Sequence, residues 1–347
     1  MEGLTYQAGK RRIPVQSSNL KVKQMLRNSI LSAALLLLVF APHASAELTA
    51  EQQTAKDRGI TLFNQYKAAA TELRIAAEAG DAEAQFYLAE ELRKETQFLT
   101  ADAQKWYEAS AAQGDYYSMF KLATSEGDLC ATANKCPAGS KSAGAWLELL
   151  IKTAEPRALK GDAEAMAIMY HAKSDLTWLE KSAEAGYAPA QWLLANRYSE
   201  GEGSFLPWNR KSAEEKWLKA SAEGGFPKAM IEYISILYER GDMEGVRHWL
   251  EVAANTGYQD AVSSYGAYLS HTPDKVGYPI DLVKGFALVS LLKELDGGGN
   301  VQVYVEGKLP VIAKKMTPEQ ILEANDFAKK WKATHPPLSF YPEKLGL

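Results

Sequence analysis

The sequence predicts an all-α protein, an α-solenoid in which helix–turn–helix repeats stack one on the next. Two observations support this prediction: a pattern of glycine, small and large apolar residues recurs six times, and no segment shows the alternation of a β-strand. The composition is that of an ordinary globular protein, with 46% hydrophobic and 24% charged residues among 347.

Six glycines mark the repeat, and we call them the marker glycines: Gly80, Gly114, Gly161, Gly186, Gly225 and Gly257. An alanine stands three residues before each of them: Ala77, Ala111, Ala158, Ala183, Ala222 and Ala254. A small residue follows four positions later: Ala84, Ser118, Ala165, Ala190, Ala229 and Ala261. A large apolar residue follows at the eighth position: Leu88, Leu122, Met169, Leu194, Tyr233 and Tyr265. Tryptophan precedes four of the glycines by eight: Trp106, Trp178, Trp217 and Trp249.

The spacing of these columns predicts pairs of helices. Offsets of four and eight place the small and the large residue on one stripe of a helix. Glycine, which has no Cβ, ends the preceding helix in a left-handed conformation, and alanine allows two helices to approach closely. A single pair cannot bury its apolar face, so the repeats stack. Length variation falls in the other loops, such as 198–203 and 173–175.

The N-terminal 46 residues have the pattern of a signal peptide with an N-terminal extension. Basic side chains precede an apolar run at 30–41, and Ala44, Ser45 and Ala46 follow it. We expect cleavage after Ala46; Met25 would be an alternative start of translation. The alternative to cleavage is a membrane anchor, but a bilayer core requires about 20 apolar residues.

The remaining chain divides into an N-terminal cap, the repeats and a C-terminal cap. Residues 47–76 are predicted as a capping helix, with one helix over 51–76, and 77–290 as six repeats. Residues 281–287 resemble the start of one more second helix of a pair, and three glycines at 297–299 interrupt the array. The C-terminal cap spans 291–347.

The C-terminal cap contains a clear helix signal. Thr317, Pro318 and Gln320 form the pattern of an N-cap with proline at the first helical position and a capping box, so a helix is predicted to about Thr334. Prolines at 336 and 337 end it. Residues 338–347, which we call the tail, are predicted to be irregular and to fold back against the last helices.

Two segments carry a resemblance to a known family. Residues 215–225 (EKWLKASAEGG) and 179–190 (LEKSAEAGYAPA) resemble Sel1-like repeats (SLR), relatives of tetratricopeptide arrays. The resemblance covers about 77–290, and it departs from the pattern at Ser118 and in the long insert after Leu122. It implies a solenoid that binds other proteins.

The two cysteines, Cys130 and Cys136, lie in that insert. In an oxidising compartment two cysteines separated by five residues usually pair, so we expect a disulfide. The alternative, a redox or metal pair, would normally have a different spacing. The histidines have no partner at metal-ligand spacing, so neither a metal nor a cofactor is expected.

Ser118 and Lys121 match the S-x-x-K motif of penicillin-recognising enzymes. Some relatives in the resembled family are associated with weak β-lactam hydrolysis. The companion S-D-N and K-T-G motifs are missing from this sequence, and Ser118 occupies the helix-contact column. We therefore expect no catalytic residues and no enzyme, and weak hydrolysis by Ser118 and Lys121 is the less favoured alternative.

The predicted function is binding of another protein. Residues at offsets three, seven and ten after the marker glycines are predicted to face outward on the concave wall: Tyr87, Glu90, Tyr117, Lys121, His171 and Asn196. They form either a recognition surface or ordinary solvated variation. The loop residues Phe205 and Trp208 are either an interaction knob or a plug between helices. Residues 47–347 carry nine more acidic than basic side chains, so nucleic acid is not expected as a partner.

The resemblance and the signal peptide together suggest a periplasmic protein without stable membrane insertion after cleavage. Some periplasmic SLR proteins are immunity proteins that neutralise phospholipase effectors delivered by type VI secretion, and this role is the more concrete hypothesis. The alternative is a scaffold for envelope assembly or regulation. The oligomeric state and the partner's identity stay open.

Overall fold

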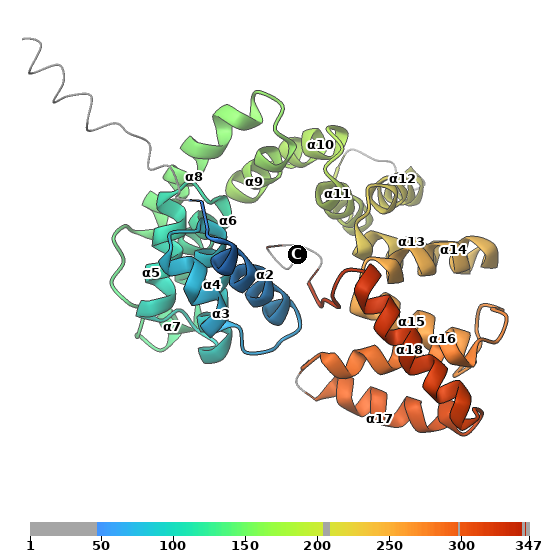
Figure 1. Ribbon diagram of the computed structural model, residues 1–347. Helices are drawn as coiled ribbons and strands as arrows, with labels where there is room; N and C mark the ends of the chain where they lie inside the picture. The colour runs from blue at the N-terminus through green and yellow to red at the C-terminus, as the bar shows by residue number, and fades with distance from the viewer. Residues whose placement is uncertain (1–46, 204–208, 298, 342–343, 345–347) are drawn as a thin grey trace, which may run out of the picture. The chain divides into compact units, whose positions relative to one another are not determined.

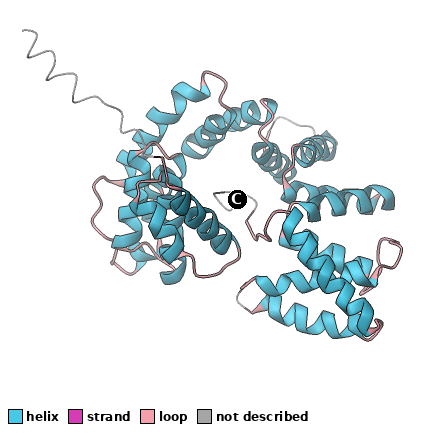
Figure 2. Cartoon of the chain, in the orientation of Figure 1, coloured by secondary structure: helices cyan, strands magenta, loops and turns pink. Residues whose placement is uncertain are grey.

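The computed structural model describes residues 47–203, 209–297, 299–341 and Lys344. The predicted signal peptide and the loop residues Phe205 and Trp208 lie outside them. Over these residues the regular elements are helices, and the β-type pairing is limited to one bridge between Tyr258 and Ser339 (Figure 2). No helix in this part is long and apolar enough to cross a membrane. The predicted all-α fold is confirmed.

The repeats consist of helices that precede and helices that follow the marker glycines. The pre-glycine helices are α3 (Ala70–Glu78), α5 (Ala101–Ala112), α8 (Ala143–Ala158), α10 (Leu176–Glu184), α12 (Arg210–Glu223) and α14 (Met243–Asn255). The post-glycine helices are α4 (Ala82–Thr96), α6 (Tyr116–Ala123), α9 (Ala163–Lys173), α11 (Ala188–Glu200), α13 (Pro227–Glu239) and α15 (Gln259–Leu269). Helices along this series pack against their neighbours in the chain, as in a solenoid. In Figure 1, α4 and α11 lie on the inner side of the curved row and α5 and α12 on its outer side.

The predicted columns have the geometry that the spacing indicated. All six marker glycines have positive φ, between 80° and 96°, where a side chain would be strained. The alanines three residues earlier and the small residues four later are fully or almost fully buried. The large residues at offset eight are buried as well. The helix–turn–helix prediction is therefore confirmed in each repeat.

A serine column that the sequence reading missed fastens consecutive repeats together. It stands four residues before three of the marker glycines, and each hydroxyl donates to a backbone carbonyl of the preceding post-glycine helix. The bonds are Ser110 to Ala82 at 2.7 Å, Ser182 to Ala163 at 2.6 Å and Ser221 to Ala188 at 2.6 Å. All three serines are fully buried, so these hydrogen bonds replace the water that each hydroxyl loses.

The N-terminal cap differs from the prediction of one helix over 51–76. The range contains α2 (Ala50–Asn64), which ends before Tyr66 at φ 64°, and most of α3, the first pre-glycine helix of the repeats. The start of α3 is capped from another helix: the buried carboxylate of Glu91 in α4 accepts the Ala69 N–H at 3.0 Å. Because this cap comes from 22 residues away, the local sequence carries no signal for the break.

The C-terminal cap contains α16 (Leu282–Leu291), the short 3₁₀ helix η3 (Leu292–Glu294), α17 (Asn300–Ala313) and α18 (Pro318–Thr334). The predicted start of α16 and the capping box of α18 are confirmed; Thr317 and Gln320 cap each other reciprocally. Helix α17 was not predicted. The insert between α6 and α8 adds η1 (Ser125–Gly127) and α7 (Leu129–Thr132).

The tail does not fold back only against the last helices, so that prediction was wrong in part. The Ser339 N–H donates to the carbonyl of Gly257, but the next residue, Phe340, donates its N–H to Asn64 of α2 at 2.9 Å. Figure 1 shows the segment after α18 running toward the inner side of the row. A second hydrogen bond reaches the same end of α2: the Asp296 N–H donates to the Gln65 carbonyl at 2.9 Å. The two ends of the array are thus joined.

Candidate interaction surface

The six residues predicted for a recognition surface lie on four post-glycine helices, α4, α6, α9 and α11. We call the inward side of these helices the inner surface. Five of the six are half-buried. Tyr87 is only 8% exposed, because the rings of Phe63 and Phe86 lie 5.3 and 5.4 Å from its ring. The prediction that Tyr87 faces outward was therefore wrong, since it did not allow for α2 packing on α4.

Two of the predicted residues form a direct contact. The Lys121 ammonium lies 3.1 Å from the Glu90 carboxylate, which also accepts the Tyr107 hydroxyl at 2.6 Å. Burial, followed by the Glu90 charge, raises the pKa of Tyr107 well above its ordinary value, so the phenol stays protonated as a donor. The predicted solvent-facing position of Lys121 is only partly met, because Glu90 holds its charged end.

Tyr117 links the next two post-glycine helices. Its hydroxyl donates to the Glu164 carboxylate at 2.5 Å, from α6 to α9. Burial raises the pKa of Tyr117, and Tyr187 and Glu164 raise it further. The phenol is therefore a fixed hydrogen-bond donor rather than an acid or base near neutral pH.

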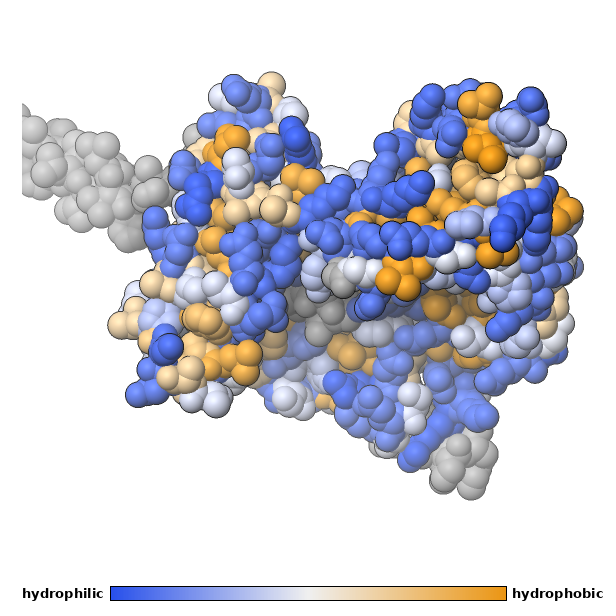
Figure 3. All heavy atoms as spheres, turned by 90° about the horizontal axis from the view of Figure 1, so that it is seen from below, coloured by the Kyte–Doolittle hydropathy of each residue, from blue (hydrophilic) through white to orange (hydrophobic). Residues whose placement is uncertain are grey.

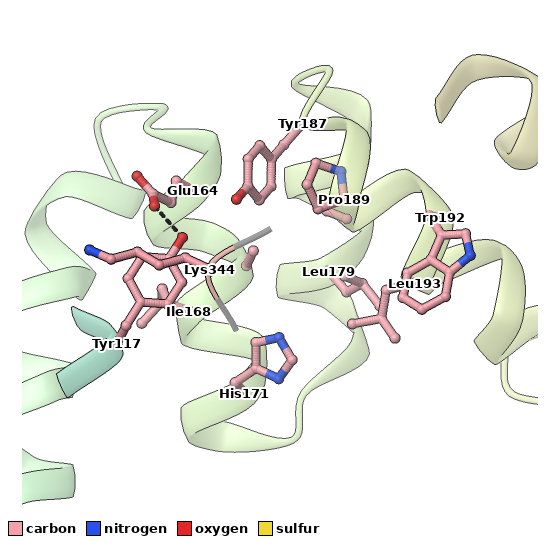
Figure 4. Close-up of a pocket in the computed structure, with 12 residues that line it drawn as sticks. Tyr117, Glu164, Ile168, His171, Leu179, Tyr187, Pro189, Trp192, Leu193 and Lys344 are labelled. Atoms are coloured by element: carbon pink, nitrogen blue, oxygen red, sulfur yellow. Dashed lines mark hydrogen bonds between the residues drawn. The ribbon is translucent and has the colours of Figure 1, made fainter. Parts of the chain in front are cut away.

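A pocket opens beside this pair on the inner surface. Its wall is mainly apolar, from Ile168, Leu179 and Leu193, and polar groups border it (Figure 4). Burial and then the Arg197 charge lower the pKa of His171, which lies at this border. The imidazole is thus neutral at pH 7 and offers one donor and one acceptor.

Asn196 belongs to a third group, between α11 and α13. With the amide oriented by its hydrogen bonds, it accepts from Trp192 at 3.2 Å and donates to Glu232 at 3.3 Å. Trp192 also lines the pocket beside His171. Burial raises the pKa of the Glu232 carboxyl. The predicted residues thus form a series of paired groups along the inner surface rather than one cluster.

The tail contributes a residue that the sequence reading did not single out. Lys344 borders the same pocket (Figure 4). Its ammonium lies 2.8 Å from the Asp115 carboxylate. Asp115 also caps α6, accepting the Ser118 N–H at 2.7 Å. The position of Asp115 directly after a marker glycine predicts the cap, but nothing in the local sequence predicts its pairing with the tail.

The S-x-x-K pair does not form a nucleophile and base. Ser118 is fully buried, and its hydroxyl has no hydrogen-bond partner among the residues described. Lys121 is held by Glu90 instead. Catalysis by an activated serine requires the base within hydrogen-bond reach of an accessible hydroxyl.

The cysteine prediction is met, since Cys130 and Cys136 form a disulfide. Within the described ranges, no group of three or more histidine, cysteine, aspartate or glutamate side chains could hold a metal ion. Hydrophilic side chains cover much of the face seen in Figure 3, with hydrophobic patches between them.

The chain is similar to solved Sel1-like repeat proteins, at low sequence identity. No protein-family model matches the sequence, and no curated protein matches it. A solved protective antigen of uropathogenic Escherichia coli, described as displaying an SLR fold, is 18% identical over 82% of this chain, with a TM-score of 0.44. This chain spans 62% of that protein's length. A Sel1 repeat protein from Oxalobacter formigenes is 20% identical, with coverage of 94% and 96% and a TM-score of 0.40. Solved Sel1-like repeat structures thus match the chain over most of its length.

Proposed function

We propose that this chain is a non-enzymatic module that binds another protein through its inner surface. The observation that carries the proposal is the series of half-buried polar and aromatic groups along α4, α6, α9 and α11, next to an apolar pocket. Aromatic side chains with a polar end, held in place by neighbouring helices, are the usual anchors of protein recognition. Stacked helical repeats present such groups on one extended wall.

The more specific proposal is a periplasmic immunity protein that neutralises a phospholipase delivered by type VI secretion. It rests on the family resemblance, on the signal-peptide pattern of residues 1–46 and on the acidic balance of residues 47–347. An envelope assembly scaffold is the alternative with the same surface. Weak β-lactam hydrolysis has less support, because the only hydroxyl of the S-x-x-K motif is buried.

The test is capture of partners from envelope extract by tagged residues 47–347, identified by mass spectrometry. An inner-surface variant, His171→Ala with Trp192→Ala, is compared with the matched variant Lys219→Ala with Lys329→Ala, whose side chains are exposed. We expect one stoichiometric partner to be captured by the wild type and the matched variant and lost from the inner-surface variant. Equal capture by all three proteins would contradict binding at the inner surface.

The identity of the captured protein separates the finer proposals. A secreted phospholipase supports immunity, and deletion of the gene should then remove self-protection from that effector. Resident envelope proteins in its place support the scaffold. Labelling of the wild type by a fluorescent β-lactam, with loss of label in Ser118→Ala, would instead establish the hydrolase.

A further inference from the structure

We infer that the tail is the chain's own ligand for the inner surface, and that this surface binds peptides with an aromatic residue three positions before a lysine. The inference rests on the proposed function and specifies the partner segment that it would take. It is carried by three kinds of contact that tail residues make: backbone pairing with the turn before α15 and with the end of α2, aromatic stacking on α2, and a lysine site beside α4 and α6.

Backbone hydrogen bonds hold the first part of the tail, at Ser339 and Phe340. Ser339 pairs on both sides with the turn before α15: its N–H donates to Gly257 at 3.0 Å, and its carbonyl accepts from Gln259 at 3.0 Å. Phe340 then donates its N–H to Asn64 at the end of α2. Backbone pairing of this kind does not depend on the side chains of the peptide, so another peptide could make the same hydrogen bonds.

The two aromatic residues of the tail, Phe340 and Tyr341, pack against aromatic rings of α2 and of the turn after it. Tyr341 stacks on Phe63 and on Tyr66, with ring centroids 5.7 and 5.5 Å apart and planes 28° apart in both cases. Phe340 meets Tyr66 edge-to-face at 5.4 Å. Contacts between aromatic rings at these separations favour an aromatic residue at this position of the peptide.

The site of Lys344 lies between α4 and α6. The Lys344 ammonium is 2.8 Å from Oδ2 of Asp115 and lies over two rings, 4.8 Å from the Phe86 centroid and 4.9 Å from that of Tyr117. The Lys344 side chain is 19% exposed and that of Asp115 10%. A carboxylate with two aromatic faces is suited to a cation, because both charge and ring quadrupoles attract it. The other oxygen of Asp115 serves the cap of α6.

Two of these tail residues line pockets at the inner surface. Lys344 borders the pocket of His171 and, with Tyr341, a second pocket that Glu90 and Arg93 also line. Tyr341 and Lys344 therefore occupy the part of the inner surface that a partner would need. Because a tethered ligand acts at an effective concentration of about millimolar, a free peptide competes poorly until the tail is weakened.

The experiment measures binding of a fluorescein-labelled peptide with the sequence of residues 338–347 (LSFYPEKLGL) by anisotropy. The proteins are residues 47–347 as wild type, as the released variant Tyr341→Ala with Lys344→Ala, and as the released variant with Asp115→Asn. Asparagine still caps a helix but carries no charge, so α6 is kept. Far-ultraviolet circular dichroism and the melting temperature verify that each variant folds.

We expect the released variant to bind the peptide at least tenfold more tightly than the wild type does. Addition of Asp115→Asn should reduce that affinity at least fivefold, and a peptide with alanine in place of its lysine should lose as much. Equal affinity of wild type and released variant, or no effect of Asp115→Asn, would overturn the inference. Hydrogen exchange gives an independent check: rapid exchange of the Ser339 and Phe340 amides in the wild type would also overturn it.

Partner capture distinguishes the inference from the function on which it rests. If the released variant captures more of the envelope partner than the wild type, and the peptide displaces it, both proposals are supported. If the peptide binds as expected but does not compete with a captured partner, the inferred partner segment is wrong and the protein-binding function stands. If the peptide binds and no partner is captured at all, the tail site stands and the proposed function is contradicted.

Discussion

The ammonium of Lys344 lies 2.8 Å from the carboxylate of Asp115, a residue 229 positions earlier in the chain. Stacked repeats ordinarily contact only their neighbours, so stability and curvature are set pair by pair. Here the tail adds contacts between the two ends, through Lys344 and through the bond from Phe340 to Asn64. A change in the tail should therefore affect the first repeats as well as the last.

The two marker glycines Gly225 and Gly257 offer a matched test of tail docking. Both have positive φ, 89° and 80°. A Cβ at Gly225 would meet no atom within 4 Å, whereas at Gly257 it would lie 2.7 Å from the Pro337 carbonyl oxygen. We expect Gly225→Ala to lower the free energy of unfolding by about 1–2 kcal/mol through backbone strain alone. Gly257→Ala should cost more and should release the tail.

Urea unfolding and hydrogen exchange of the Ser339 amide measure these two effects. The Ser339 amide should lose protection in Gly257→Ala and keep it in Gly225→Ala, since its acceptor is the Gly257 carbonyl. Equal destabilisation by the two substitutions, with the amide protected in both, would show that the tail does not depend on this turn.

The repeats could be predicted from the sequence because their determinants are local. A marker glycine, an alanine three residues before it, a small residue four after it and a large apolar residue eight after it lie within about three turns of helix. The break between α2 and α3 could not be predicted, because the Ala69 N–H is capped by Glu91 from the next helix. The pairing of Lys344 with Asp115 joins still more distant segments.

The candidate surface could likewise be predicted where it depends on the repeat, and not where it depends on the caps. Glu90 and Lys121 fall on corresponding faces of successive post-glycine helices, so the repeat itself brings them together. The position of Tyr87 depends on α2, which stands outside the repeat pattern and covers it with Phe63. Glu90 and Lys121 were thus found from the repeat, whereas the cover of Tyr87 by α2 and the docking of the tail were not.

The disulfide of the insert should contribute measurable stability. It closes a loop with a sequence separation of 6. In the chain-entropy model so short a loop contributes roughly 2 kcal/mol. We expect Cys130→Ala with Cys136→Ala to lower the free energy of unfolding by about that amount in urea under non-reducing conditions. In reducing agent the wild type should lose the same amount and the double variant nothing; a wild type insensitive to reduction would contradict this contribution.

The buried hydroxyl of Ser118 should destabilise the folded protein. It has no hydrogen-bond partner in the described part of the chain, and the other repeats have alanine at this position. A buried polar group without a partner costs about 1–3 kcal/mol, so we expect Ser118→Ala to raise the free energy of unfolding by roughly 1 kcal/mol. Urea unfolding provides the measurement.

Ser110 is the matched control for this substitution. It is equally buried, but its hydroxyl donates to the Ala82 carbonyl at 2.7 Å. We expect Ser110→Ala to lower the free energy of unfolding by about 1 kcal/mol, because the buried hydrogen bond between α5 and α4 is lost. The same sign for both substitutions would mean that hydrogen bonding does not decide the effect of a buried serine in these repeats.

Asp128 should make stability depend on acid pH. Its buried carboxylate accepts the N–H groups of Leu99 and Cys130, each at 2.9 Å, and pairs with Arg93 at 2.9 Å. Burial alone would raise the pKa of Asp128, but the hydrogen bonds and the Arg93 charge outweigh it and lower the pKa below its ordinary value. The folded protein therefore binds this proton less readily than the unfolded chain does.

The sign of the effect follows from that difference. The stabilisation is complete above the unfolded pKa of about 4 and is lost as the pH falls through the lower folded value. We expect Asp128→Asn to cost about 1–3 kcal/mol at pH 7 and to lose less further stability than the wild type between pH 5 and pH 2, measured by urea unfolding at each pH. Asp326→Asn, at an exposed pair with Lys329, should change stability by less than about 0.5 kcal/mol at pH 7. Parallel pH profiles of stability for the wild type and Asp128→Asn would show that Asp128 does not link folding to protonation.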